Sequence, residues 1–313
     1  MAQKTSIEWC DVSWNPVRGC SRVSEGCRNC YAERMAARFS GFGQPFTDFA
    51  AMTPAGPLWT GKVALIPEKL DEPLHWRKPR RVFVNSMSDL FHEGLSDRDV
   101  AKVFSAMRFA PRHTFQVLTK RPARMLEWFS KCGNGGGLGW ITHNNTEPER
   151  AYRGTGVIVG ESDRWPLPNV WLGVSVENQA TADERIPLLL QTPAAVRFVS
   201  LEPLLGPVDI SQYLDGRCGS CGAVLPRSGS AVGECSKCEW GTFYAGIQWA
   251  IIGGESGPGA RPMDLAWLES AVQQCREAGV PIFIKQDSGR FPGQQGRIPD
   301  DLWIKEFPHD PRS

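Results

Sequence analysis

The sequence predicts an α/β protein: a partial (β/α)6-type parallel barrel with a small zinc-ribbon insertion. Short apolar segments alternate with helix-like segments along most of the chain. A group of three cysteines follows the first predicted strand, and two Cys-x-x-Cys pairs interrupt the alternation later. At 313 residues with 41% hydrophobic content, the chain is long enough to bury one barrel-sized core.

The predicted strands are short runs rich in valine, isoleucine, leucine and phenylalanine. After a first strand that ends before Cys20, they cover residues 81–85, 114–118, 171–175, 197–200, 249–253 and 281–285. Strands joined through helices imply parallel crossovers, and these seven fit a six-stranded partial barrel with one extra strand. An open doubly wound sheet is the alternative, because periodicity does not decide whether a sheet closes.

Helices are predicted between the strands from apolar residues at helical spacing. They cover residues 31–40, 97–109, 123–129, 181–190 and 263–278, with Ser96 capping the second and Gly279 ending the last. Two segments lack this periodicity. We expect residues 41–75 to form a loop-rich crossing over the barrel mouth and residues 132–168 a flexible insertion.

The two cysteine groups therefore fall in different parts of the chain. The barrel is expected to cover residues 1–215 and 246–313, and the zinc ribbon residues 216–245. The formal charge is only +1, so nucleic-acid contact must use local patches. The start lacks an apolar signal core, and no run approaches the roughly 18 apolar residues of a membrane span. We expect a cytoplasmic protein without membrane contact, whose ten cysteines serve metal before disulfides.

Cys20, Cys27 and Cys30 lie on a loop that leads straight into the first predicted helix. Three thiolates can hold three irons of a four-iron cube and leave the fourth iron open, whereas structural zinc and electron-transfer clusters usually take a fourth protein ligand. The alternatives are a zinc site completed by Cys10 or a histidine, buried thiols without function and, less favoured, a disulfide framework.

The second group consists of two Cys-x-x-Cys pairs separated by thirteen residues: Cys218, Cys221, Cys235 and Cys238. This spacing indicates a closed tetrahedral zinc site, with rubredoxin-like iron as the minor alternative. The glycine, serine and proline residues between the pairs cannot build a core, so the metal is expected to supply much of the folding energy.

Most predicted strands end in polar residues. These ends are Asn85–Asp89, Thr119–Arg121, Ser175–Asn178, Ser200–Glu202 and Gly253–Ser256. Function gathers at the carboxyl ends of parallel strands, so this ring indicates a site, although some of its members are expected to be helix caps or turn residues.

The three-cysteine loop and the run Cys27-Arg-Asn-Cys30-Tyr-Ala-Glu-Arg34 resemble the cluster loop of radical S-adenosylmethionine enzymes, particularly the spore photoproduct lyase branch. Six residues separate Cys20 from Cys27 where that superfamily usually has three. The closest overall likeness is to a group of phage-associated proteins of unassigned substrate, through the elements Ile-Glu-Trp, Trp-Asn-Pro and Gly-Cys between Ile7 and Cys20.

The resemblance implies a [4Fe-4S] cluster on the first three cysteines and bound S-adenosylmethionine. The residues implied to contact this cofactor are Ser88, Asp89, Lys120 and Ser175. A carboxylate suits its ammonium group, a lysine its carboxylate and hydroxyls its ribose. The implied reaction is reductive cleavage to methionine and a 5′-deoxyadenosyl radical, which removes hydrogen from the substrate.

The same resemblance suggests a nucleobase in DNA or RNA as the substrate and requires an external electron donor. No catalytic residue is assigned; Cys10, Cys132, Cys275 and Tyr31 are candidate radical relays for which buried structural roles are favoured. The rival hypothesis is a non-catalytic, metal-stabilised nucleic-acid-binding protein, suggested by the zinc ribbon and by the basic stretch at residues 77–81.

Overall fold

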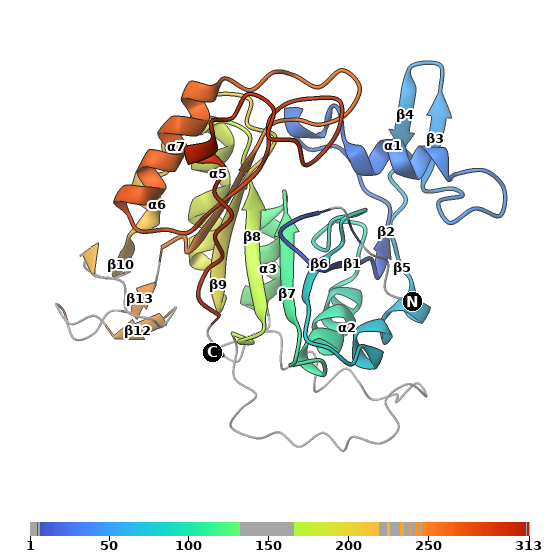
Figure 1. Cartoon of the computed structure of the whole chain (residues 1–313). Coiled ribbons are helices and arrows are strands. Elements are labelled where there is room, and N and C mark those ends of the chain that lie inside the picture. The colour runs from blue at the N-terminus through green and yellow to red at the C-terminus, as the bar shows by residue number, and fades with distance from the viewer. Residues whose placement is uncertain are drawn as a thin grey trace.

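The structure is a computed structural model that describes residues 5, 7–131, 166–218, 224–225, 232–234, 238, 242–244, 246–310 and 312. Its centre is a seven-stranded sheet in the order β1-β6-β7-β8-β9-β14-β15. All neighbouring strands are parallel, and the sheet curls into a half-barrel (Figure 1). The strands are β1 (Val12–Trp14), β6 (Arg81–Val84), β7 (Thr114–Thr119), β8 (Val170–Ser175), β9 (Val196–Leu201), β14 (Trp249–Gly253) and β15 (Ile282–Gln286).

The sheet follows the chain order of the seven predicted strands. Each crossover returns the chain beside the strand that it has just left, so β1 and β15 form the two edges. The prediction of a partial parallel barrel is confirmed at this level. Among the described residues, no helix combines the length and the apolar character that crossing a membrane requires.

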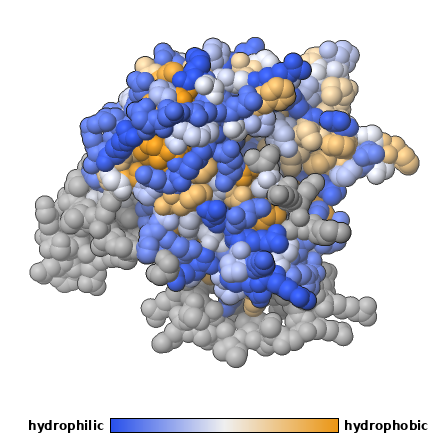
Figure 2. Space-filling model, in the orientation of Figure 1, coloured by the Kyte–Doolittle hydropathy of each residue, from blue (hydrophilic) through white to orange (hydrophobic). Residues whose placement is uncertain are grey.

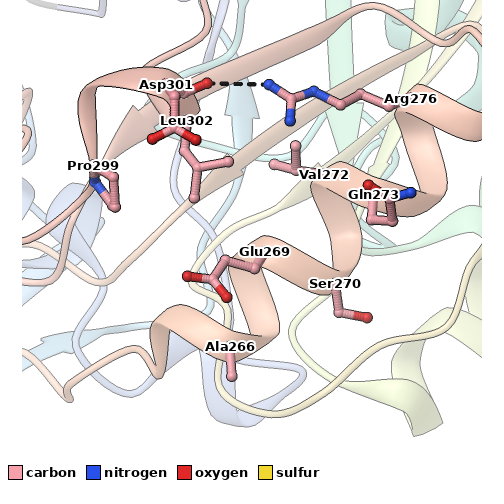
Figure 3. Close-up of a pocket in the computed structure, with 9 residues that line it drawn as sticks. All are labelled: Ala266, Glu269, Ser270, Val272, Gln273, Arg276, Pro299, Asp301 and Leu302. Atoms are coloured by element: carbon pink, nitrogen blue, oxygen red, sulfur yellow. Dashed lines mark hydrogen bonds between the residues drawn. The ribbon is translucent and has the colours of Figure 1, made fainter.

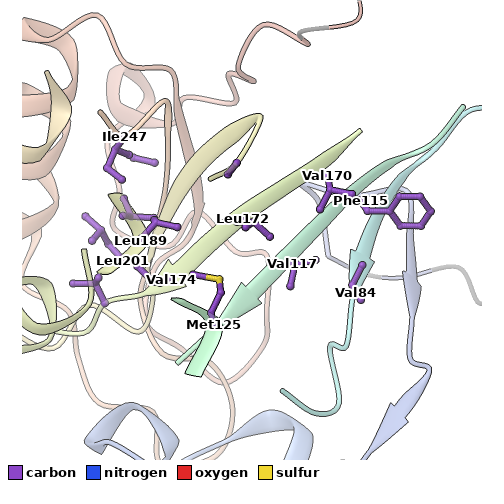
Figure 4. Packing of buried hydrophobic residues seen from close by; sticks show 14 of the residues in the cluster. Val84, Phe115, Val117, Met125, Val170, Leu172, Val174, Leu189, Leu201 and Ile247 are labelled. Atoms are coloured by element: carbon purple, nitrogen blue, oxygen red, sulfur yellow. The ribbon is translucent and has the colours of Figure 1, made fainter. Parts of the chain in front are cut away.

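Helices pack against the convex face of the sheet. These helices are α2 (Asp97–Arg108), α3 (Pro122–Lys131), α5 (Gln179–Gln191), α6 (Ser211–Leu214) and α7 (Leu265–Glu277), whereas α1 (Tyr31–Arg38) lies outside this layer (Figure 1). Between the sheet and this layer, Val84, Val117, Leu172 and Val174 pack against Met125 and Leu189 (Figure 4). The predicted cap at Ser96 is confirmed, since its hydroxyl accepts a hydrogen bond from the Asp99 amide at 3.1 Å.

Aromatic side chains fill the concave face at the amino ends of the strands. The cluster includes Trp9, Phe83, Trp171, Phe198, Trp249, Phe283 and Phe307. Trp249 lies at its centre and is fully buried. A Cβ atom on Gly173 would lie 2.5 Å from the Phe198 ring, so only glycine fits there. This filling leaves the carboxyl ends of the strands as the place on the concave face where a ligand can bind.

Residues 41–75 contain more regular structure than we expected. β3 (Ala50–Thr53) and β4 (Gly56–Trp59) form a hairpin, and β5 (Ala64–Leu65) pairs with β2 (Val17–Arg18). Two 3-10 helices follow, η2 (Pro67–Lys69) and η3 (Glu72–His75). The hairpin packs on α1 and projects with it beyond the sheet (Figure 1). Strands of two to four residues are too short to show a sequence period, which explains the miss.

A small antiparallel sheet lies between β9 and β14 along the chain, where the insertion was predicted. Its strands are β10 (Gly216–Cys218), β11 (Val224–Leu225), β12 (Val232–Glu234) and β13 (Thr242–Tyr244), in the order β11-β10-β13-β12. Cys221 and Cys235 lie outside the described residues, as do Cys132 and the predicted insertion up to residue 165.

Candidate functional site

The cysteine loop, residues 19–30, runs from β2 to α1 across the carboxyl ends of the strands. It begins at Gly19, whose φ of +88° favours glycine and whose Cβ would lie 1.9 Å from the Lys62 carbonyl oxygen. A short 3-10 turn, η1 (Glu25–Cys27), follows. Cys30 then precedes the first residue of α1, so the helix fixes the position of the last thiol.

The three thiols lie near one another, since Cys30 contributes to the pKa of Cys20 and Cys27 to the pKa of Cys30. Cys27 is buried, and Cys20 and Cys30 are partly buried. Burial, with smaller contributions from Asp89 and Cys30, raises the pKa of Cys20 to about 12. Burial also raises the pKa of Cys30, with a smaller contribution from Cys27. Arg121 places Nη1 3.9 Å from the Cys20 sulfur, so a cation already faces the place where thiolate charge would form.

The described donor side chains do not form a site for a single metal ion. Within the described ranges, no three histidine, cysteine, aspartate or glutamate side chains converge as ligands of one metal ion. A four-iron cube binds each thiolate at a different iron, so its ligands need not converge on one point.

Cys10 does not provide a fourth ligand. It lies before β1, in the aromatic cluster at the amino ends of the strands, whereas the cysteine loop crosses the carboxyl ends. Its sulfur is 3.6 Å from the Ile7 carbonyl oxygen, and burial raises its pKa to about 12. The zinc alternative completed by Cys10 is therefore excluded by position.

Arg121 is the first of three anchors that hold the loop. Its guanidinium donates to the Ser21 hydroxyl at 2.8 Å and carbonyl oxygen at 3.1 Å. The same group pairs with Glu93 at 3.0 Å and with Asp89 at 3.3 Å. Asp89 also accepts from the Thr119 hydroxyl at 2.8 Å, so it holds the end of β7 under the loop.

His92 also contacts Ser21, the loop residue that Arg121 binds. Its Nδ1 accepts from the Gly94 amide at 2.9 Å, so in the neutral ring the proton is on Nε2, which lies 2.9 Å from the Ser21 hydroxyl. Burial, together with the neighbouring Arg121, lowers the pKa of His92 below its ordinary value of 6.5. The imidazole is therefore neutral at pH 7 and acts as a hydrogen-bonding support.

Glu177, after β8, is the second anchor. Its carboxylate accepts from the Ser24 hydroxyl at 2.9 Å and pairs with Arg185 of α5 at 3.1 Å and with Lys120. A Cβ on Gly26 would lie 2.4 Å from this carboxylate, so the loop backbone rests directly on it. Burial opposes its ionisation, but the two cations outweigh burial and lower the pKa of Glu177 below 4.5.

Glu255, after β14, is the third anchor. It accepts from the Asn29 amide nitrogen at 2.8 Å and from the Arg261 guanidinium at 2.6 Å. Arg261 extends the contact by donating to the Glu25 carbonyl oxygen at 2.9 Å. Burial raises the pKa of Glu255, but its hydrogen bonds with Arg261 and Asn29 prevail and hold it below 4.5.

Polar groups also line the concave face beneath the loop. Ser175 and Ser200 are opposite each other on β8 and β9. Glu202 and Lys285 form an ion pair at 2.5 Å at the ends of β9 and β15. On the concave face, the lining therefore changes from aromatic rings at the amino ends of the strands to hydroxyls and paired charges at their carboxyl ends.

The structure brings together three of the four residues predicted to contact the cofactor. Asp89, Lys120 and Ser175 follow or end the adjacent strands β6, β7 and β8, and the Lys120 amide donates to Asp89 at 3.0 Å. Ser88 instead donates to the Val17 carbonyl oxygen at 3.0 Å, which ties β2 to the end of β6.

Four important side chains were not assigned as site residues from the sequence: Arg121, Glu177, Arg185 and Glu255. Three of them belong to the predicted ring of polar strand ends. The sequence therefore predicted where they lie but not that they hold the cysteine loop. Arg185 shares a helical face with the buried Ala182, Ile186 and Leu189. A charged residue at that spacing indicates a buried partner, and this could have been noticed.

A surface depression elsewhere belongs to the outer helix layer. It lies between α7 and η6 (Asp300–Leu302), where Arg276 donates to the Asp301 carbonyl oxygen at 3.1 Å (Figure 3). Its lining has no cysteine or histidine, so the cysteine loop is the better candidate site.

Comparisons with known proteins add one finding. A family model described as "Protein of unknown function (DUF5131)" matches residues 4–301. A search of curated proteins and a search of solved structures gave no match.

Proposed function

The chain belongs to the family described as "Protein of unknown function (DUF5131)", and we propose that it is a radical S-adenosylmethionine enzyme. Cys20, Cys27 and Cys30 would hold its [4Fe-4S] cluster. The observation that carries the proposal is the three-cysteine loop itself, held over the carboxyl ends of β7, β8 and β14 by three buried anchors. These strand ends are where parallel α/β folds place their chemistry.

When bound, the cluster would supply the electron that cleaves S-adenosylmethionine to methionine and a 5′-deoxyadenosyl radical, which takes a hydrogen atom from the substrate. An external donor returns the electron. The chain's own residues fix the loop, and the aromatic cluster excludes water from below.

The residues proposed to surround the cofactor divide into two pairs. Lys120 and Ser175 lie at the carboxyl ends of β7 and β8, where a hydroxyl suits a ribose and the lysine, which already pairs with Glu177, would also suit a carboxylate. Ser88 is already bonded to β2 and Asp89 to the end of β7, so they would act mainly by holding these strand ends in place.

We also propose a structural zinc ion on Cys218, Cys221, Cys235 and Cys238. β10 and β12 each pair antiparallel with β13, so they run in the same direction. Cys218 and Gly233 both pair with Phe243. The two strands that lead into the Cys-x-x-Cys pairs therefore finish at the same end of the small sheet, which is the arrangement that a shared zinc site needs.

A cytoplasmic location and a nucleobase substrate in DNA or RNA complete the proposal. The rival function, a nucleic-acid-binding protein without catalysis, is separated from it by iron content and by cofactor cleavage.

The test is to purify the protein without oxygen and measure its metals and its reaction. We expect about four irons and four sulfides with one zinc per chain. With S-adenosylmethionine and a reductant, the sample should form 5′-deoxyadenosine. Cys27→Ala should lose the iron and the product but keep the zinc, and Cys218→Ala should lose the zinc alone. A colourless protein carrying only zinc, or an iron-replete protein that never cleaves the cofactor, overturns the proposal.

A further inference from the structure

Exposed apolar side chains gather on the unit that projects beside the cysteine loop. Of the seven large hydrophobic side chains exposed in the described part, six lie in this stretch: Val23, Tyr31, Phe39, Phe42, Met52 and Leu58. Phe42 is 102% exposed. Figure 2 shows hydrophobic atoms among hydrophilic ones on this projection, at the right of the view. Such a surface marks a contact with another molecule.

The same unit carries positive charge. Residues 18–62 hold six basic and three acidic side chains, a net charge of +3 compared with +1 for the whole chain. Each acid is already paired: Glu25 with Arg261, Glu33 with Arg22 and Asp48 with Lys62. Within the described residues, four arginines of the unit therefore have no carboxylate partner: Arg18, Arg28, Arg34 and Arg38.

Aromatic rings and guanidinium groups occur together on this surface. Tyr31, Arg34 and Arg38 follow one another at helical spacing on the less buried side of α1, and Phe39 and Phe42 come directly after. The Arg38 guanidinium lies 5.7 Å from the centre of the Phe39 ring. We call these five residues the arginine–aromatic face.

The arginine–aromatic face extends to the carboxyl ends of the strands. Arg34 donates to the Ser256 carbonyl oxygen at 3.0 Å, and Ser256 follows the Glu255 anchor. Tyr31 directly follows Cys30. A chain bound along α1 would therefore pass beside the cysteine loop.

We infer that the arginine–aromatic face binds single-stranded DNA or RNA and brings an unpaired base to the cysteine loop. This inference rests on the proposed function and names its substrate class. Exposed rings stack on unpaired bases, and guanidinium groups without carboxylate partners pair with phosphates. A duplex hides the faces of its bases, which favours the single strand.

Fluorescence anisotropy with a fluorescein-labelled 20-nucleotide oligothymidylate tests the inference on the anaerobic full-length protein, without S-adenosylmethionine. Phe42→Ala should raise the Kd about tenfold, because one stacked base is lost. Arg38→Ala should also weaken binding and reduce the dependence of the Kd on salt. Both side chains are exposed, so the variants should keep the melting temperature of the parent.

Arg77→Ala is the matched control. Arg77 is exposed in the basic stretch before β6, at the opposite end of the sheet from the mouth. Its loss should change the Kd less than twofold. Equal weakening by Arg77→Ala, or equal affinity for a duplex, would overturn the inference in favour of general charge attraction.

The outcome also separates this inference from the proposed function. Formation of 5′-deoxyadenosine by a protein that does not bind the oligonucleotide overturns the inference alone and points to a protein partner for the exposed rings. Binding through Phe42 by an iron-replete protein that never cleaves the cofactor supports the inference and overturns the proposed function.

Discussion

The two ends of the half-barrel are stabilised by different interactions. At the amino ends of the strands, apolar rings fill the concave face around the fully buried Trp249. At the carboxyl ends, buried Arg121, Glu177 and Glu255 hold a loop through hydrogen bonds and ion pairs. Packing depends on volume and tolerates pH changes, whereas the anchors depend on charge and direction. The comparison indicates that one end supports the fold and the other positions the thiols.

The largest effect is expected at the aromatic end. Trp249→Ala should lower the free energy of unfolding by about 3–5 kcal/mol, because it leaves a cavity among large rings. Urea unfolding measures this loss. Phe291→Ala is the control, since Phe291 is 57% exposed and its removal should change stability by less than about 0.5 kcal/mol. Similar losses in the two variants would contradict the assignment of the rings as the structural end.

Gly26→Ala should separate cluster binding from folding. The new methyl group would lie 2.4 Å from the Glu177 carboxylate, so the loop must move away from its anchor. We expect most of the iron to be lost, with a smaller cost to stability of about 1–3 kcal/mol. Iron analysis and unfolding of the same sample measure both.

The control for this variant is Gly41→Ala, whose Cβ would meet only the Gln44 side chain at 3.7 Å. That variant should keep its iron. Full iron content in Gly26→Ala would show that Glu177 does not position the loop.

The smallest effect is a pH dependence at the third anchor. The folded protein holds the pKa of Glu255 below 4.5, so the unfolded chain binds the proton more readily. The stability from the ionised carboxylate is fully present above pH 4.5 and is lost as the pH falls through the lower folded value. Glu255→Gln should therefore cost about 1–3 kcal/mol at pH 7 and progressively less below pH 4.5.

Thermal unfolding of both proteins between pH 7 and pH 3.5 measures that difference. Glu269→Gln, an exposed position on α7, should behave like the parent at every pH. A constant difference in stability between Glu255→Gln and the parent across this range would mean that the packing of the Glu255 side chain, and not its charge, holds the loop.

The sequence predicted the parts of this molecule that repeat. Seven apolar runs and a capping serine follow local rules of period and hydrogen bonding, and the strands of the half-barrel lie where these rules placed them. The hairpin β3–β4 was missed because its strands are too short for a period. The anchors were missed for another reason: a sequence shows that Glu177 follows a strand, but not that Ser24 and Arg185 meet it in space.

The anchors are distant in sequence from the loop that they hold. Ser24 and Glu177 are 153 positions apart, and Asn29 and Glu255 are 226 apart. During synthesis, the cysteine loop is therefore made well before Glu255, the last of its anchors. A nascent chain that carries the three cysteines but not Glu255 lacks part of the framework that positions them, so the proposed cluster would be bound only after this anchor has been made.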